Sequence, residues 1–138
     1  SEYAAKKCPQ NDIFAIDLLD MKPVKNVSFF KSDIREIDQV EPIFTKKGSF
    51  DLVISDLAPN ITGIDVIDNE SILKLNMLTL DIAVNLSNTQ SKFLVKTFQN
   101  SNFKSLKKEM ELFFKIVQTY KPAASKNKSA ETYLYGAR

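Results

Sequence analysis

Carboxylates follow three successive apolar segments of this sequence. Asp17 follows the letters FAI, Asp33 comes shortly after SFF, and Asp56 comes directly after VIS. Apolar segments of this kind are typical of strands that are covered on both faces. Because parallel sheets bind ligands beyond the carboxyl ends of their strands, an acid placed there is both fixed and accessible. The pattern predicts a ligand site formed by strand ends.

The first two acids suit the recognition of a nucleotide. An acid after an early strand of a nucleotide-binding sheet usually accepts hydrogen bonds from ribose hydroxyls, and an acid after the next strand can accept from an adenine amino group. The alternatives are that Asp17 caps a turn into Leu18-Leu19 and that Asp33 caps a helix near Arg35. Three acids in this order favour the nucleotide site over three separate caps.

Lys96 is an unusual residue for the interior of a strand, since it lies within the apolar segment FLVKTF, residues 93–98. A buried ammonium is costly unless it loses its proton or finds an acid. One interpretation is a lysine that extends past the strand end into solvent. The other directs Lys96 to the same pocket as Asp56. Glu131, just before TYLYGA, is a third candidate for that pocket, although a lone glutamate is normally a surface acid.

Strands and helices alternate along the chain, which predicts an α/β fold with a mostly parallel Rossmann-like sheet and helices on both faces. Apolar segments predict strands over residues 12–17, 27–30, 51–55, 92–98, 116–120 and 132–136. Apolar residues at helical spacing predict helices over 2–7, 35–44 and 68–86, the last capped by Asp68 or Asn69. A further helix, capped by Asn102, has an apolar stripe of Phe103, Leu106, Met110 and Phe113. The 138 residues suit one domain.

Composition excludes several kinds of chemistry. The chain has no histidine, so histidine acid–base catalysis and Ser-His triads are ruled out. Cys8 is the only cysteine, which leaves no internal disulfide and no zinc site, and we expect no metal. No apolar run reaches the roughly 20 residues of a membrane span, so we expect no membrane partner. Seven lysines between Lys104 and Lys128 predict either a basic binding surface or a solvated lysine face.

Longer motifs give the sequence a resemblance to a known family. The chain resembles the FtsJ-type ribose 2'-O-methyltransferases in the stretches IDLLDMKPV, SDIRE, DLVISDLAPNITG, FLVKTFQ and KPAASKNKSAETY, which occur in family order over nearly the whole chain. The letters APN, followed by a small residue and glycine, are more similar to the ribosomal RNA branch than to the transfer RNA or cap branches.

The resemblance implies a class I methyltransferase sheet that is mostly parallel with an antiparallel final strand. It also implies a cofactor and a catalytic set. The cofactor is S-adenosyl-L-methionine, and the set is Lys-Asp-Lys-Glu, of which Asp56, Lys96 and Glu131 match the last three members. It further implies that Asp17 binds the cofactor ribose, that Asp33 contacts adenine, and that Asp56 also lies near the methyl group. Lys96 would be the base that accepts the proton of the ribose hydroxyl.

The resemblance also implies a substrate, a uridine of large-subunit ribosomal RNA. Lys121, Lys126 and Lys128 flank Glu131, so we expect them to bind RNA phosphates, which gives affinity without sequence preference. We expect a monomer that acts on ribosomal RNA or the large ribosomal subunit, in the cytoplasm or, for a eukaryotic organellar homologue, in the mitochondrion.

The front of the chain departs from the family pattern. The family's first lysine, first strand and glycine-rich cofactor loop have no counterpart here. The only glycines are Gly48, Gly63 and Gly136, and none opens a helix after a strand. We therefore expect the chain to correspond to the C-terminal two-thirds of the family domain.

Rival functions stay open on the sequence alone. A nicotinamide-dependent dehydrogenase would share the sheet and Asp17, but it would not explain Lys96 together with Glu131. A non-catalytic RNA-binding remnant of this fold would keep the basic loop and lack the cofactor loop. A 2'-O-methyltransferase acting on transfer RNA or an mRNA cap is a third alternative.

Overall fold

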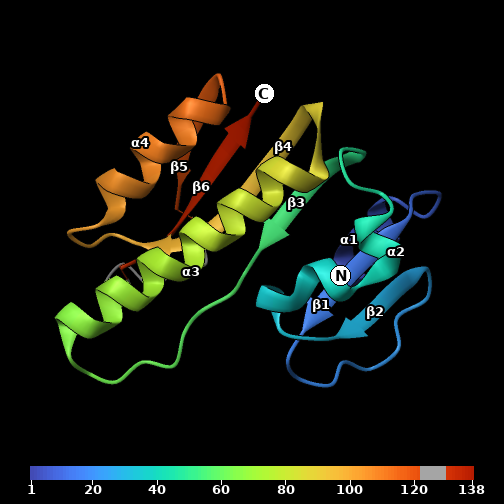
Figure 1. Cartoon of the computed structure of the whole chain (residues 1–138), viewed down its shortest axis with the longest axis horizontal. Helices are drawn as coiled ribbons and strands as arrows, with labels where there is room; N and C mark the ends of the chain where they lie inside the picture. Colours follow the sequence, from blue (N-terminus) through green and yellow to red (C-terminus); the bar gives the residue numbers. More distant parts are fainter. Residues whose placement is uncertain (122–129) are drawn as a thin grey trace. The chain divides into compact units, whose positions relative to one another are not determined.

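The computed structural model describes residues 1–121 and 130–138 (Figure 1). Its elements, in chain order, are α1 (Glu2–Lys7), β1 (Ile13–Asp17), β2 (Val27–Lys31), the 3-10 helix η1 (Ile34–Gln39), α2 (Glu41–Phe44), β3 (Phe50–Ser55), α3 (Asp65–Leu86), β4 (Ser87–Phe98), α4 (Phe103–Phe113), β5 (Ile116–Tyr120) and β6 (Glu131–Ala137). These elements form two compact units, an N-terminal unit of Ser1–Lys46 and a C-terminal unit of Lys47–Arg138. The single domain over residues 1–138 stays a prediction.

The N-terminal unit is built on two parallel strands. β1 and β2 pair from Ile13 opposite Val27 to Asp17 opposite Lys31, so their carboxyl ends lie at one edge. The predicted helix over 35–44 is wrong, because a 3-10 helix ends at Gln39 and α2 begins only at Glu41. Pro42 explains the break: it has no amide hydrogen and its ring would clash with a preceding carbonyl, so it is tolerated only in a first helical turn.

The C-terminal unit contains a four-stranded sheet in the order β3-β4-β6-β5. β3 and β4 are parallel, whereas β6 is antiparallel to both of its neighbours, β4 and β5. The α/β class and the antiparallel final strand that the sequence predicts are confirmed. The predicted start of β4 at Lys92 is wrong, since the strand begins at Ser87 opposite Phe50, before a register shift between Phe50 and Leu52. Polar residues in this irregular pairing carry no apolar periodicity that a sequence pattern could detect.

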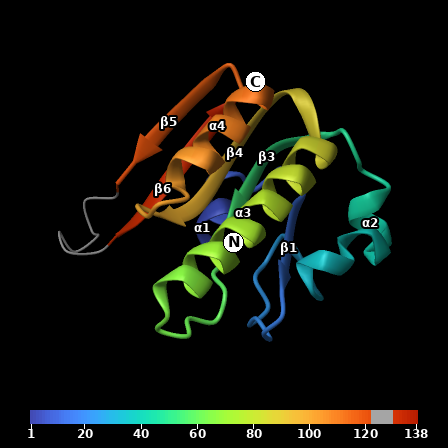
Figure 2. The same ribbon diagram turned by 60° about the vertical axis from the view of Figure 1, so that its left-hand side comes forward.

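One face of this sheet holds the core. In both ribbon views α3 and α4 lie side by side on the same face of the sheet (Figures 1 and 2). The buried core side chains are Leu80, Ala83, Phe93, Val95, Leu106, Met110, Phe114 and Leu134. The prediction that Phe113 belongs to this core is wrong: it is 44% exposed, whereas Phe114 is 3% exposed. The chain leaves the helix at this point with extended backbone at Phe114, which moves the buried position by one residue.

The loop before α3 is tied to the helix by Asp68. The helix begins at Asp65, and not at Asp68 or Asn69 as predicted. The buried Asp68 carboxylate instead accepts hydrogen bonds from the Thr62 amide and hydroxyl, both 2.8 Å, and from the Gly63 amide, 3.0 Å. These bonds, led by the Thr62 amide, hold the pKa of Asp68 below its usual range. Asp68 therefore fixes the loop before α3 and does not cap the first backbone amides of the helix.

The expected side-chain cap of α4 is also absent. Asn102 is in the capping position, but its side chain makes no capping hydrogen bond. The side-chain nitrogen of Asn102, Nδ2, instead donates to the Asn69 backbone carbonyl at 3.2 Å. The side-chain nitrogen of Asn100 donates to Asn69 Oδ1 at 3.0 Å. The oxygens of Asn69 on α3 compete with local backbone groups for the side chains of Asn100 and Asn102. Both asparagines therefore join the start of α4 to α3.

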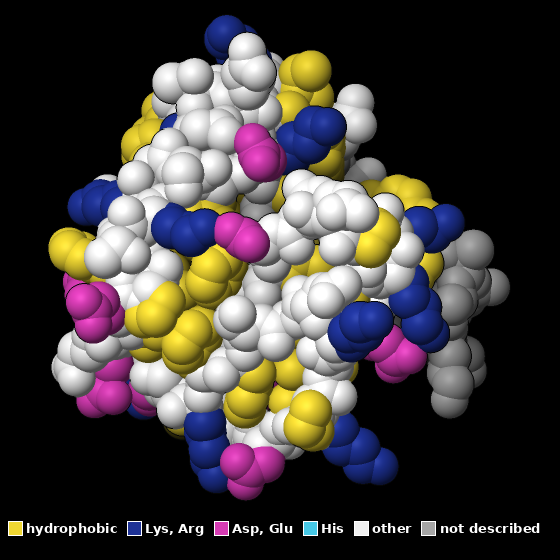
Figure 3. All heavy atoms as spheres, turned by 90° about the vertical axis from the view of Figure 1, so that its right-hand side faces the viewer, with side chains coloured by type: hydrophobic (Ala, Val, Ile, Leu, Met, Phe, Trp, Pro, Cys, Tyr) yellow, Lys and Arg dark blue, Asp and Glu magenta, His cyan; other side chains and the backbone are white. Residues whose placement is uncertain are grey.

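Hydrophobic side chains also occur on the surface. Figure 3 shows hydrophobic side chains scattered among basic and acidic ones on one face of the molecule. Four of the exposed ones come from the two outer strands of the C-terminal sheet: Leu52, Ile54, Ile116 and Tyr120. Within residues 1–121 and 130–138, no helix combines the length and the apolar character that crossing a membrane requires.

Candidate functional site

Two predicted site residues, Asp56 and Lys96, meet a third residue on the sheet face opposite the core. Val95 and Thr97 are buried on the helix-covered face, so Lys96 between them points to the other face. Tyr133 is directly opposite Lys96 across the β4–β6 pairing and shares its face. Asp56 directly follows β3, the neighbour of β4 on the other side. The sheet thus places an acid, a lysine and a phenol in one row.

The row is joined by contacts to a single oxygen. The Lys96 ammonium nitrogen lies 3.3 Å from Asp56 Oδ1, and the Tyr133 hydroxyl donates to the same oxygen at 3.2 Å. The Lys96 side chain is only 14% exposed, whereas that of Asp56 is 72% exposed. A nearly buried ammonium requires a partner, and Asp56 is that partner. This contact bears out the interpretation that directs Lys96 toward Asp56 and not past the strand end into solvent.

Tyr133 is the residue of this row that sequence reasoning missed. Burial raises its pKa above the ordinary value for tyrosine, and the charge of Asp56, the hydrogen bond to Asp56 and the charge of Glu131 add to the effect. The phenol therefore stays protonated near neutral pH and remains a donor. Tyrosine is an ordinary strand residue, so only its position opposite Lys96 could have drawn attention to it.

Glu131 begins β6 and pairs with Phe98. Because it precedes Tyr133 by two residues, it lies on the same face of the sheet, about 7 Å away along the strand. Its charge is one cause of the raised Tyr133 pKa, which places it within electrostatic reach of the row. The catalytic role of Glu131 stays a prediction.

Buried polar groups also neighbour Lys96 and Asp56 in the chain. Asn76 of α3 donates to Thr97 Oγ1 at 2.9 Å, and both residues are 2% exposed. This bond fixes the helix against β4 at the residue after Lys96. Next to Asp56, the buried Ser55 hydroxyl has no hydrogen-bond partner within the described part of the chain. Ser55 shares the helix-covered face with Val53, which packs against the core, so an ordered water on that face would satisfy it.

In the N-terminal unit, Asp17 ends β1 and forms the expected turn. Its Oδ1 accepts from the Leu19 amide at 2.9 Å. Among the described residues, its second carboxylate oxygen makes no hydrogen bond. The turn and a ribose contact are compatible, because a carboxylate offers about four acceptor positions.

Asp33 serves as a cap in this structure. Its Oδ1 accepts from the Arg35 amide and from Arg35 Nε, both at 2.9 Å, and its Oδ2 accepts from Arg35 Nη2. The hydrogen bonds from Arg35 lower the pKa of Asp33 from 3.8 to about 2. Its predicted contact with adenine has to share the carboxylate with Arg35.

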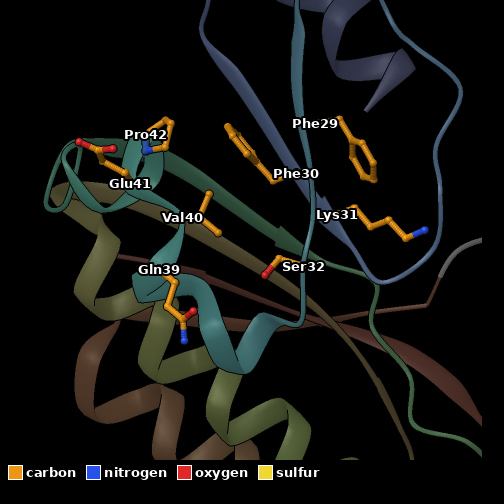
Figure 4. A pocket seen from close by; sticks show the side chains of 8 residues that line it. All are labelled: Phe29, Phe30, Lys31, Ser32, Gln39, Val40, Glu41 and Pro42. Carbon is orange, nitrogen blue, oxygen red and sulfur yellow. The ribbon is translucent and has the colours of Figure 1, made fainter.

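A surface hollow of about 570 Å³ lies beside β2 in the same unit (Figure 4). Figure 4 shows Phe29 and Lys31 extending to one side of the strand and Phe30 to the other, as strand alternation requires. The lining residues are Phe29, Phe30, Lys31, Ser32, Gln39, Val40, Glu41 and Pro42. The hollow reaches Ser32, next to Asp33, but neither predicted cofactor acid lines it.

The expected RNA-binding lysines are only partly described. Lys121 directly follows β5, whereas Lys126 and Lys128 lie outside the described residues. Their binding of RNA stays a prediction. In the part of the chain that the structure describes, no cluster of three or more histidine, cysteine, aspartate or glutamate residues could hold a metal ion.

Comparison with known sequences assigns the chain to a group. The family model described as FtsJ-like methyltransferase matches residues 1–138. A relative named Ribosomal RNA large subunit methyltransferase E, from Buchnera aphidicola subsp. Cinara cedri, is 36% identical over all of this chain and 68% of its own. The protein of the same name from Neisseria meningitidis serogroup C is 42% identical over 99% of this chain and 68% of its own. The chain thus spans about two-thirds of the length of these relatives.

Solved structures have the same fold. A protein from Plasmodium falciparum assigned as a ribosomal RNA methyltransferase superposes with a TM-score of 0.82 at 25% identity, over 97% of this chain and 76% of its own. A protein from Streptococcus mutans assigned as a methyltransferase, solved in complex with SAH, gives a TM-score of 0.54 at 8% identity, over 91% of this chain and 70% of its own. The second likeness concerns the fold alone.

Proposed function

This chain belongs to the FtsJ-like methyltransferase family, and from that premise we propose that it methylates a ribose 2'-hydroxyl of RNA with S-adenosyl-L-methionine as the methyl donor. The observation that carries the proposal is the row of Asp56, Lys96 and Tyr133, in which one carboxylate oxygen holds a nearly buried lysine and a protonated phenol. A site without histidine needs another base, and a lysine fixed at a strand end suits that role.

The acids of the chain suit the chemistry of the donor. When bound, S-adenosyl-L-methionine supplies an electrophilic methyl group on a positively charged sulfonium. In the N-terminal unit, Asp17 has a carboxylate oxygen available for ribose hydroxyls, and Asp33 is the proposed acceptor for the adenine amino group. In the C-terminal unit, Asp56 is the proposed counter-charge for the sulfonium.

Each residue of the row has a proposed task in the reaction. The proposed role of Lys96 is to accept the proton of the 2'-hydroxyl as its oxygen takes the methyl group of the bound donor. Since Lys96 pairs with Asp56 as an ammonium, it would first have to release its own proton to solvent. Asp56 orients Lys96, and Tyr133 restrains Asp56 by its hydrogen bond. Glu131 positions the lysine or the ribose. Alignment of the hydroxyl with the methyl group is expected to supply much of the rate.

The proposed substrate is large-subunit ribosomal RNA. Relatives that share 36% and 42% identity with this chain carry that substrate in their names. A uridine is the expected target within it, and Lys121, Lys126 and Lys128 are the expected phosphate contacts. The proposal places the protein where ribosomes are assembled, in the cytoplasm or, for an organellar homologue, in the mitochondrion.

The test measures transfer of a tritiated methyl group from S-adenosyl-L-methionine to large-subunit RNA by the intact protein. We expect a product whose backbone resists alkali at one nucleotide, because methylation removes the 2'-hydroxyl that alkaline cleavage requires. Lys96→Ala should remove most of this transfer. Lys92→Ala is the matched control, since Lys92 is an exposed lysine on the same strand and the same face, and it should remain active.

Two results would contradict the proposal. Incorporation into a base, with the backbone still cleaved by alkali at every position, would exclude ribose methylation. RNA binding without methyl transfer by the intact protein would instead support a non-catalytic remnant of the fold. Methylation of transfer RNA or an mRNA cap in preference to ribosomal RNA would keep the reaction and change the substrate.

A further inference from the structure

The row of side chains continues past Tyr133 to the edge of the sheet. Tyr120 is the last residue of β5 and is directly opposite Tyr133 in the β5–β6 pairing. Val117 packs against the core, so Tyr120, three positions further along the strand, points to the opposite face, which is the face of Lys96 and Tyr133. One line across the sheet therefore contains Lys96, Tyr133 and Tyr120 in that order.

Exposure rises along this line. The Lys96 side chain is 14% exposed, whereas Tyr120, on the outer strand, is 60% exposed. The backbone at Tyr120 is held in place, since the buried Thr132 hydroxyl donates to its carbonyl at 3.2 Å. A large aromatic ring on a fixed backbone, two strands from Lys96 and open to solvent, is suited to contact a substrate.

We propose that Tyr120 is a stacking platform for an unstacked base of the RNA substrate, next to the ribose that Lys96 deprotonates. The inference rests on the proposed function and adds a subsite to it. Adjacent strands are about 4.8 Å apart, so Tyr120 is about 10 Å from Lys96 across the sheet. A nucleotide whose ribose is at Lys96 can reach this ring with its own base or with that of its neighbour.

The chemistry of an exposed tyrosine favours a nucleobase as its partner. Proteins bind single-stranded RNA by stacking splayed-out bases on aromatic side chains and by placing cations beside the backbone. Lys121 follows Tyr120 directly, so a positive charge adjoins the ring in the chain. The other role available to Tyr120 is structural, as a cross-strand aromatic partner of Tyr133 that stabilises the sheet edge.

The test compares variants of the intact protein in equilibrium binding of a labelled single-stranded RNA oligonucleotide. Tyr120→Ala and Tyr120→Leu should weaken RNA affinity about 5- to 150-fold, the range expected for the loss of one stacked base. Tyr120→Phe should keep wild-type affinity, because the ring is retained. With large-subunit RNA as substrate, Tyr120→Leu should raise KM for RNA more than it lowers kcat.

Controls separate this role from a structural one. Gln118→Ala, on the same strand and the same face, should leave RNA affinity unchanged, as should loss of the exposed Tyr3 in Tyr3→Ala. Affinity for S-adenosyl-L-methionine and the melting temperature of Tyr120→Leu should equal those of the wild type. Wild-type RNA affinity in Tyr120→Leu would overturn the inference, and so would a loss that appears equally in cofactor affinity and melting temperature.

The same measurements distinguish the two proposals. Methyl transfer by the wild-type protein tests the proposed function, whereas the RNA affinity of the Tyr120 variants tests the stacking platform. If the wild type methylates RNA and all Tyr120 variants bind RNA equally well, only the platform is wrong. If the wild type methylates no ribose, the proposed function is wrong and the platform loses its place beside a reacting ribose.

Discussion

The Lys96 ammonium on β4 lies 3.3 Å from the carboxylate of Asp56, which directly follows the neighbouring strand β3. Among the described residues, this contact alone pairs the nearly buried lysine with the solvent-exposed end of β3. The pair is unequal, because Asp56 is accessible and Lys96 is not. Lys96 therefore depends on Asp56 for its charge compensation, whereas Asp56 can also face a ligand.

Lys96→Ala should remove most methyl transfer while cofactor affinity stays nearly unchanged, since the lysine acts only in the reacting complex. Lys96→Arg should not restore the activity, because arginine does not give up its proton at working pH. The measurements are tritiated-methyl incorporation into ribosomal RNA and calorimetric cofactor affinity for each variant. Substantial activity in Lys96→Arg would mean that only the positive charge matters.

Tyr133→Phe should lower kcat about tenfold, because it removes one hydrogen bond to a charged group and keeps the ring. The KM values for cofactor and RNA should change less than kcat. Tyr135→Phe is the matched control, since Tyr135 is on the same strand and the same face but pairs with Leu94. Equal kcat in both variants would show that the bond from Tyr133 to Asp56 has no part in the reaction.

Asp17→Ala should weaken binding of S-adenosyl-L-methionine about tenfold or more, because buried ribose hydroxyls would lose their acceptor. Asp20→Ala provides a control in the same loop, as Asp20 pairs with Lys31 at 2.8 Å and has no proposed contact with the cofactor. Isothermal calorimetry of both variants of the intact protein makes the comparison. Unchanged affinity in Asp17→Ala would remove this residue from the cofactor site.

Asp33 should remain ionised at a pH where most aspartates are protonated. Its pKa is lowered from 3.8 to about 2 by Arg35, so the stabilisation from this contact is complete above about pH 4 and is lost as the pH falls through about 2. Carboxyl carbon NMR shifts followed against pH would record this titration. In Arg35→Ala, the Asp33 pKa should return toward 3.8, and an unchanged low value would show that Arg35 is not the cause.

Gly136→Ala should destabilise the fold by about 1–3 kcal/mol, which is the usual cost of overpacking a core. An added Cβ at this position would lie 2.8 Å from Phe114 Cγ and 3.1 Å from Met110 Cε. Gly48→Ala is the contrasting control, because its added Cβ meets no atom within 4 Å and its cost arises only from the positive φ of 78°. Denaturant unfolding measures both, and wild-type stability in Gly136→Ala would contradict the packing argument.

The sequence predicts the fold well where apolar periodicity is strong and less well where local polar groups compete. All six strands were expected within a few residues, except for the polar start of β4. The start of α3 was misplaced because Asp68 accepts hydrogen bonds from the loop before the helix, which a capping pattern cannot reveal. The start of α4 after Asn102 was predicted correctly, although the Asn102 side chain bonds to Asn69 and makes no cap. The split of the predicted 35–44 helix was foreseeable, since Pro42 stands inside it.

The site was predictable to the extent that its residues are unusual for their positions. A lysine inside an apolar strand and an acid at a strand end attract attention without any structure, and the Asp56–Lys96 contact followed from their neighbouring strands. Tyr133 and Tyr120 are common strand residues, so their importance depends on pairing register alone. The sequence alone does not show which strands pair with each other, so it does not specify this register.

The three hydrogen bonds that Asp68 accepts from Thr62 and Gly63 have a consequence for motion. The segment between β3 and α3 begins with Asp56, and its far end is fastened to the first turns of a 22-residue helix. Local opening of this segment must therefore break contacts to the helix, which raises its free-energy cost above that of an unattached loop. The Asp56 carboxylate thus belongs to a segment that is held at both ends, by the sheet and by the helix.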